Sequence, residues 1–171
     1  RQGVAQTMLV GAKIPPRYRT CDLESFITYE NDLLLCAVDR ARRFIDLFPV
    51  VDKGLLLIGP PGIGKSFLVA RMAVALMEQH EGSDTLVLPY RFSSGDDMRC
   101  SRDAFAQFVI ERLVARDALV DEAPVKKQDK AEEKLKAHLG LLSPGRKLIL
   151  ILDGLDELLS RDVDFAEEIP L

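Results

Sequence analysis

The feature that most constrains the fold of this chain is the stretch GPPGIGKS at residues 59–66. It fits the pattern G-x-x-x-x-G-K-[ST], a short glycine-bounded loop that ends in lysine and a hydroxyl side chain. The run before it, GLLLIG at 54–59, is continuously apolar, which is typical of a strand buried on both faces. The run after it, 65–79, is apolar almost all round and predicts a packed helix. The pattern therefore indicates a strand, a tight loop and a helix in that order.

Each residue type in this stretch suits the binding of a phosphate chain. Backbone N–H groups of the loop and first helical turn lack intrahelical partners and lie at the positive end of the helix dipole. Gly62 and Gly64 permit the backbone angles and the close approach that phosphates require. Lys65 supplies a positive charge to the β and γ phosphates, and Ser66 offers a hydroxyl oxygen to Mg²⁺.

We therefore expect ATP or ADP to bind with Mg²⁺ at this loop. The alternative is a Gly-Pro turn with an incidental lysine, which is disfavoured because four specified positions rarely coincide by accident. The expected nucleotide contacts come from consecutive residues, namely Gly59, Pro60, Pro61, Gly62, Ile63, Gly64, Lys65, Ser66 and Phe67.

A second candidate motif follows the apolar run KLILIL at 147–152. A buried strand that delivers Asp153 at its carboxyl end places the aspartate where ligands bind in parallel sheets. We expect Asp153 to hold Mg²⁺, through water, opposite Ser66. If Leu155 begins a turn or helix, Asp156 and Glu157 project toward the same cleft and one of them orients the attacking water. The alternative is that these two acids only favour a helix N-terminus. The candidate catalytic residues are Lys65, Asp156 and Glu157.

The remaining sequence alternates helical and strand-like segments. Helices are predicted over 31–48, with Asn31 as the cap, over 101–116, with Ser101 as the cap, and over 131–142. A strand is predicted over 85–92, at an edge or bulge because of Pro89. This order predicts an α/β fold with a mostly parallel sheet. Three strands are few for such a sheet, so we expect the N-terminal portion of a larger domain over 23–171, preceded by a linker or arm over 1–22.

Composition excludes several classes of function. The net charge of −4 and the pI of about 5.3 give no electrostatic footprint for nucleic acid. Apolar runs are far shorter than the roughly 20 residues that span a bilayer, and no secretory pattern opens the sequence. The three cysteines are widely spaced, which disfavours a disulfide framework or a cysteine metal site. We expect a protein of the cytoplasm that binds neither membranes nor nucleic acid directly.

The two motifs resemble those of the STAND class of P-loop NTPases, and within it the NACHT group. GPPGIGKS looks like their Walker A motif, and LILILDGLDE looks like their Walker B motif. In the NACHT pattern a small residue follows the metal-directing aspartate and acids come two or three positions later, as Gly154, Asp156 and Glu157 do here. Residues 90–114 are more loosely similar to the region that follows the second strand in NACHT modules. The resemblance implies a P-loop NTPase three-layer sandwich, incomplete in this chain and truncated after Walker B. One departure is Thr28-Tyr29-Glu30, where the family often has a Gly-Arg-Glu-like element near the adenine.

The resemblance implies a switch ATPase of a signalling or defence protein, in which slow hydrolysis controls conformation and self-association. The alternative is a module that holds ATP or ADP for assembly and does not hydrolyse it. A third interpretation, a P-loop kinase, requires an arginine-rich lid after the last strand. It is disfavoured because 155–171 offers only Arg161.

Overall fold

The structure, a computed structural model, describes residues 10, 16, 23–24, 26–48, 54–59, 62, 64–96, 100–116, 118–119 and 130–160. The chain divides into two compact units, residues 1–82 and residues 83–171, and each is described by itself. The expected arm at 1–22 lies almost wholly outside the described residues, as does 161–171 with Arg161.

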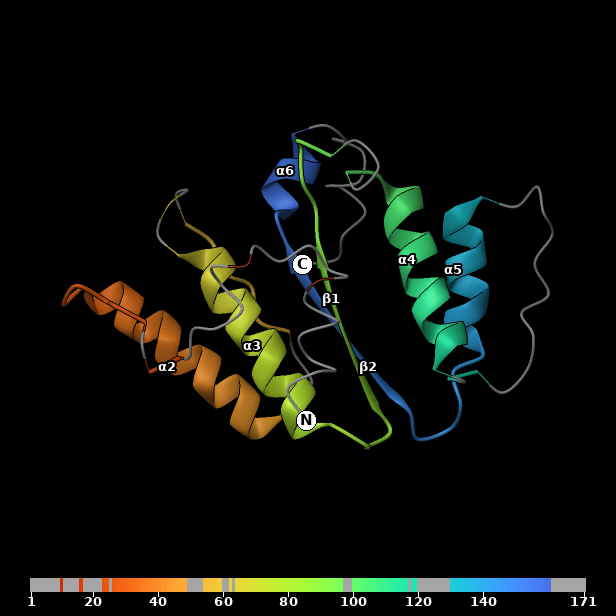
Figure 1. Ribbon diagram of the computed structural model, residues 1–171, viewed down its shortest axis with the longest axis horizontal. Helices are drawn as coiled ribbons and strands as arrows, with labels where there is room; N and C mark the ends of the chain where they lie inside the picture. The colour runs from red at the N-terminus through yellow and green to blue at the C-terminus, as the bar shows by residue number, and fades with distance from the viewer. Residues whose placement is uncertain are drawn as a thin grey trace. The chain divides into compact units, whose positions relative to one another are not determined.

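The first unit is built around two helices, α2 (Asp32–Leu47) and α3 (Lys65–Gln79), drawn in orange and yellow in Figure 1. Both lie where the sequence predicts them. The residues that α2 buries recur at spacings of three and four, as an amphipathic helix requires: Val38, Ala41 and Ile45. α3 buries seven residues, which confirms the prediction of a packed helix. The helices also meet at their C-terminal ends, where the Phe48 ring lies edge-on to His80 with centroids 5.3 Å apart.

The strand expected at 54–59 is wrong for the part of the chain that the structure describes. These residues form no strand, and the two named strands pair with each other in the second unit. Leu56 is 51% exposed and Ile58 is 85% exposed, whereas Leu55 and Leu57 are partly buried. Apolar composition alone does not make a strand, because a strand also needs hydrogen-bonded neighbours.

The second unit contains a parallel pair of strands, β1 (Thr85–Arg91) and β2 (Lys147–Asp153). The register runs from Thr85 opposite Lys147 to Arg91 opposite Asp153, and Figure 1 shows the two strands side by side. Parallel pairing confirms the predicted sheet type. Pro89 is accommodated because β1 has one neighbour among the described strands. The strand predicted at 147–152 is present, but the prediction that it is buried is wrong for Leu150, which is 38% exposed.

The connection from β1 to β2 contains two helices that lie against each other, α4 (Arg102–Ala115) and α5 (Ala131–Gly140). Ser101 caps α4 as predicted, because its side chain accepts a hydrogen bond from the Ala104 N–H at 3.2 Å. Arg102 on α4 forms an ion pair with Glu132 on α5 at 3.2 Å. This connection returns the chain in the same direction, as a parallel pair of strands requires.

A short helix, α6 (Leu155–Leu159), follows β2 and packs near the carboxyl end of β1 (Figure 1). The packing depends on a cluster of buried side chains from both chain segments: Tyr90, Phe92, Cys100 and Leu158. The rings of Tyr90 and Phe92 lie 5.0 Å apart in an edge-on arrangement, which aromatic pairs prefer. This cluster fixes the start of α6 against the residues that follow β1.

The N-terminus of α2 provides a first testable prediction. Asn31 accepts hydrogen bonds from the N–H groups of Leu33 and Leu34, at 3.0 and 3.2 Å. Replacement Asn31→Ala should lower the free energy of unfolding by about 1 kcal/mol, because two helix donors lose their acceptor. Urea denaturation measures this change. Asn31→Asp retains an acceptor oxygen and should stay close to the unsubstituted protein; an equal loss in both variants would contradict the capping role.

Candidate functional site

Two glycines of the loop have the backbone angles that the sequence predicts for them. Gly62 and Gly64 both have positive φ, 86° and 88°, in the left-handed region that favours glycine. Gly64 is the N-cap of α3, and its carbonyl oxygen accepts the first helical hydrogen bond, from the Leu68 N–H at 3.0 Å. Because glycine has no side chain, no side-chain oxygen caps the first turn. Pro60, Pro61 and Ile63 lie outside the described residues.

Lys65 contacts the first residue of the motif that it helps to end. Its ammonium group donates a hydrogen bond to the carbonyl oxygen of Gly59, the first residue of the motif. The side chain thus contacts an oxygen acceptor at the opposite end of the motif. Ser66 and Phe67 are partly buried in the first turn of α3. Five of the residues predicted to contact nucleotide, Gly59 and Gly64 to Phe67, therefore gather at one helix start.

Phe26 packs against this helix start, and the sequence analysis did not identify it. Its ring centroid lies 5.3 Å from that of Phe67. A Cβ added to Gly64 would lie 3.0 Å from Phe26 Cε2, so the ring nearly touches the loop backbone. Tyr29 and Glu30, in the stretch that departs from the family pattern, have positive φ of 49° and 55°. No local sequence signal links a single phenylalanine to a loop nearly forty residues later.

The contact made by Phe26 gives a second prediction. Phe26→Ala should lower the free energy of unfolding by about 2 kcal/mol, because it removes a partly buried ring and an aromatic pair. It should also weaken nucleotide binding several-fold, because the loop loses a support. Urea denaturation and a nucleotide titration measure the two effects. Phe26→Leu keeps most of the apolar contact and serves as the control. If Phe26→Ala lowers the free energy of unfolding by less than about 0.5 kcal/mol, the ring does not support the loop.

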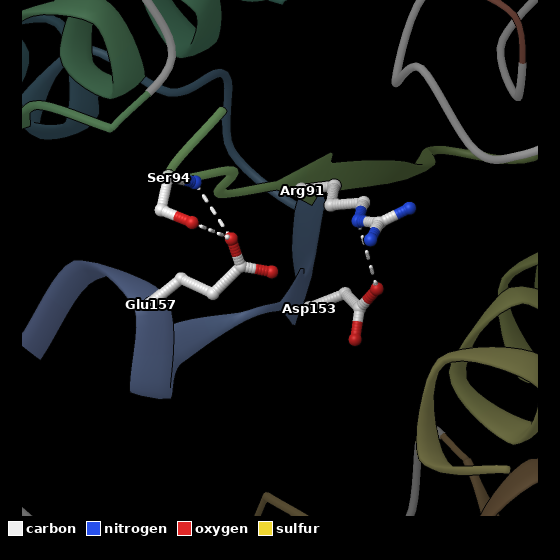
Figure 2. A network of polar contacts seen from close by, with 4 residues as sticks. All are labelled: Arg91, Ser94, Asp153 and Glu157. Atoms are coloured by element: carbon white, nitrogen blue, oxygen red, sulfur yellow. Dashed lines mark hydrogen bonds and ion pairs between the residues drawn. The ribbon is translucent and has the colours of Figure 1, made fainter. Parts of the chain in front are cut away.

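In the second unit, Asp153 lies at the carboxyl end of β2 and is 7% exposed. Its neighbour in the sheet register is Arg91, whose Nε lies 3.6 Å from Asp153 Oδ2 (Figure 2). This distance defines an ion pair, but it is longer than a hydrogen bond. A buried carboxylate needs a compensating charge, and here a guanidinium provides one.

Gly154 turns the chain from β2 into α6. Its φ is +75°, and a Cβ at this position would lie 2.5 Å from the carbonyl oxygen of Phe92. The backbone of Phe92 cannot withdraw easily, because its N–H donates to the carbonyl oxygen of Asp153 at 2.9 Å. A side chain is therefore excluded directly after Asp153, and no carboxylate fits at that position.

The two acids that follow differ in their surroundings. Both lie in the first turn of α6, as predicted, which is also what the helix N-terminus alternative expects. Asp156 is exposed, whereas Glu157 is partly buried. Glu157 Oε2 accepts hydrogen bonds from the backbone N–H of Ser94 at 2.6 Å and from its hydroxyl at 2.8 Å (Figure 2). Glu157 thus joins α6 to the loop after β1, so it does more than complement a helix dipole.

The sequence analysis did not identify Arg91 and Ser94 as the partners of Asp153 and Glu157, although the sequence contains a signal for both contacts. The carboxyl ends of parallel strands meet at one edge of a sheet, so polar residues just after β1 should lie near those just after β2. Applying this rule to 91–94 and 153–157 identifies both contacts.

The loop and the buried aspartate define a class of protein. A glycine-rich loop that ends in lysine and serine at a helix start, with an aspartate that terminates a parallel strand, is the construction of a P-loop nucleotide-binding domain. The family model of the NACHT domain matches residues 53–171, more than half of the chain, and the chain belongs to this family. The resemblance is thereby confirmed, and the chain is a domain of the P-loop NTPase type.

The other comparisons add nothing to this assignment, since searches of curated proteins and of solved structures found no match. The mixed helices and the parallel pair of strands agree with an incomplete α/β fold, whereas the three-layer sandwich stays a prediction. No helix among the described residues is both long and apolar enough to cross a bilayer.

Proposed function

We propose that the chain is the ATP- and Mg²⁺-binding module of a switch NTPase, with slow hydrolysis that controls conformation and self-association in a cytoplasmic signalling or defence protein. The observation that carries the nucleotide part is the loop geometry: Lys65 reaches back to Gly59 across glycines with positive φ. A phosphate oxygen is a stronger acceptor for this ammonium than a carbonyl oxygen, because the hydrogen bond then joins two charges.

Ser66 and Asp153 are the residues we propose for Mg²⁺. The fit rests on the chemistry of the donors: a hydroxyl in the first turn of α3 and a buried carboxylate at the end of β2. Both are oxygen ligands, which a hard cation prefers. When bound, Mg²⁺ neutralises charge on the phosphates. Asp153 is already compensated by Arg91 at 3.6 Å, so metal binding exchanges one positive partner for another.

The residues around Asp156 and Glu157 support slow rather than fast hydrolysis. The position after Asp153 admits no side chain, so the residue that orients water is not the one directly after the aspartate. Asp156 and Glu157 are the candidates, and we favour Glu157 because it is partly buried and contacts Ser94, whereas Asp156 is exposed. The same contacts favour the alternative, a module that binds nucleotide for assembly without hydrolysis, because they occupy one oxygen of Glu157.

Switching requires that two states bind the γ phosphate with different affinity. We would measure phosphate release and molar mass by light scattering for the purified protein with ATP, with ADP and without nucleotide. The proposal predicts slow Mg²⁺-dependent release, reduced by Glu157→Gln, and a mass that differs between the ATP and ADP samples. Nucleotide binding without phosphate release would favour the assembly module, and one mass in all three samples would refute the switch.

A further inference from the structure

The hydrogen bonds between β1 and β2 show which backbone groups of β1 face away from β2. The Lys147 N–H donates to the Asp84 carbonyl oxygen at 3.0 Å, and the Phe92 N–H donates to the Asp153 carbonyl oxygen at 2.9 Å. Along a strand, the N–H and C=O groups of successive residues point alternately to its two edges. The even-numbered residues of β1 therefore bond to β2, and the odd-numbered residues face the opposite edge, which we call the outer edge of β1.

Pro89 is an odd-numbered residue near the middle of β1, so its backbone nitrogen faces the outer edge. Proline has no N–H, and its ring carbon Cδ lies where the hydrogen would be. At an even-numbered position a proline would remove a hydrogen bond to β2. At position 89 it removes none, and the register continues through Pro89 opposite Ile151 to the end of the strand. The proline therefore affects only the outer edge.

Apart from Pro89, β1 has the composition of a strand that pairs readily. No charged residue occurs from Thr85 to Tyr90, and threonine, valine and tyrosine all favour strands. Among the described strands, β1 has one neighbour, β2, so no other described strand covers its outer edge. An open edge with an uncharged, strand-favouring sequence can pair with the same edge of another copy. A proline at such an edge opposes this pairing.

A second copy would have to pair with the outer edge through the odd-numbered residues of β1. In an antiparallel arrangement with Val87 of one copy opposite Pro89 of the other, each residue of the pair would normally donate one hydrogen bond. Pro89 cannot donate, so the Val87 carbonyl oxygen would face the proline ring instead. In a two-fold symmetric pair the same defect occurs twice. Because Pro89 is central in β1, other registers with a long overlap also bring the ring against the partner strand.

We propose that Pro89 closes the outer edge of β1 to a second copy of this chain, so that self-association does not take place by strand pairing at this edge. The proposal rests on the register of β1 against β2 and on the position of one proline. It is independent of nucleotide binding. Any self-association that accompanies the proposed switch then uses other surfaces.

The test measures molar mass by light scattering for the nucleotide-free protein over a range of protein concentrations. Pro89→Val restores the missing donor and should raise the mass to about twice that of the unsubstituted protein as the concentration increases. The double variant Val87→Pro with Pro89→Val moves the proline to another odd-numbered position and should restore the original mass. Pro144→Val removes an exposed proline outside β1 and should leave the mass unchanged. An unchanged mass in Pro89→Val at every concentration would overturn the proposal, and so would equal association of the double variant.

Hydrogen exchange tests the same edge in the unsubstituted protein and does not require that a variant folds. The Val87 amide faces the outer edge and the Leu88 amide bonds to β2, so the Val87 amide should exchange at least about 100-fold faster. If both amides exchange equally slowly, the outer edge is already covered and the proposal is overturned. In Pro89→Val, the Val87 amide should become protected as the protein concentration rises. Association of this variant with an unchanged Val87 amide would also overturn the proposal, because the copies would then meet elsewhere.

Discussion

Replacing Lys65 with alanine should weaken ATP binding by about 100-fold or more. Lys65 is the first residue of α3 and its ammonium group bonds the Gly59 carbonyl oxygen, so it lies at the motif where phosphates are expected. A hydrogen bond between charged groups contributes about 1.5–3 kcal/mol, and contacts with two phosphates therefore amount to roughly 3–6 kcal/mol. Each 1.4 kcal/mol corresponds to about tenfold in affinity. Calorimetric titration with Mg²⁺ and ATP measures the loss.

The matched control for this variant is Lys136→Ala on α5. Lys136 is exposed and belongs to the charged helix of the connection, so its removal subtracts the same charge without touching the loop. Its ATP affinity should stay within about twofold of the unsubstituted protein, as expected for a screened surface charge. Equal affinities in both variants would show that the loop does not bind phosphate through its lysine.

Gly154→Ala should lower the free energy of unfolding by about 3–5 kcal/mol. The positive φ of 75° costs a residue with a side chain roughly 1–2 kcal/mol. The larger part comes from the methyl group, which would lie 2.5 Å from the Phe92 carbonyl oxygen. Relief requires that β1 and α6 separate at the place where the buried cluster joins them, which forfeits packing. Urea denaturation measures the difference.

The variant Gly145→Ala separates the cost of the positive φ from the cost of the steric contact with Phe92. Gly145 also has a positive φ, 85°, but an added Cβ would meet nothing within 4 Å. This variant should lose only the conformational part, about 1–2 kcal/mol. The difference between the variants then measures the steric contact with Phe92. If both lose the same amount, the close approach of Gly154 to Phe92 contributes nothing to stability.

Much of the local structure could be predicted because local residues determine it. α2 and α4 begin after Asn31 and Ser101, whose side chains accept helix N–H donors and therefore mark the boundary in the sequence itself. α3 begins after Gly64 for a related reason, since glycine allows the left-handed angle that starts it. Parallel pairing also followed from the order of elements, because a helical connection joins the two strands.

The rest depends on contacts between distant segments. Residues 54–59 have the composition of a buried strand, but composition does not provide a hydrogen-bonded neighbour, and Ile58 is 85% exposed. Leu150 is 38% exposed although β2 is paired with β1, because the burial of a strand side chain also depends on which segments pack against its face of the sheet. The partners of the motif acids, Arg91 and Ser94, are set by the register of β1 against β2. That register is a tertiary property, and periodicity along one segment does not contain it.

The most direct test of the central claim is a calorimetric titration of the purified protein with ATP, with and without Mg²⁺. We predict saturable binding at one site, strengthened about tenfold or more by Mg²⁺, because Ser66 and Asp153 are proposed to hold the ion beside the phosphates. An additional preference for ATP over ADP would report recognition of the γ phosphate. Absence of saturable binding, or an affinity that Mg²⁺ does not change, would contradict the account.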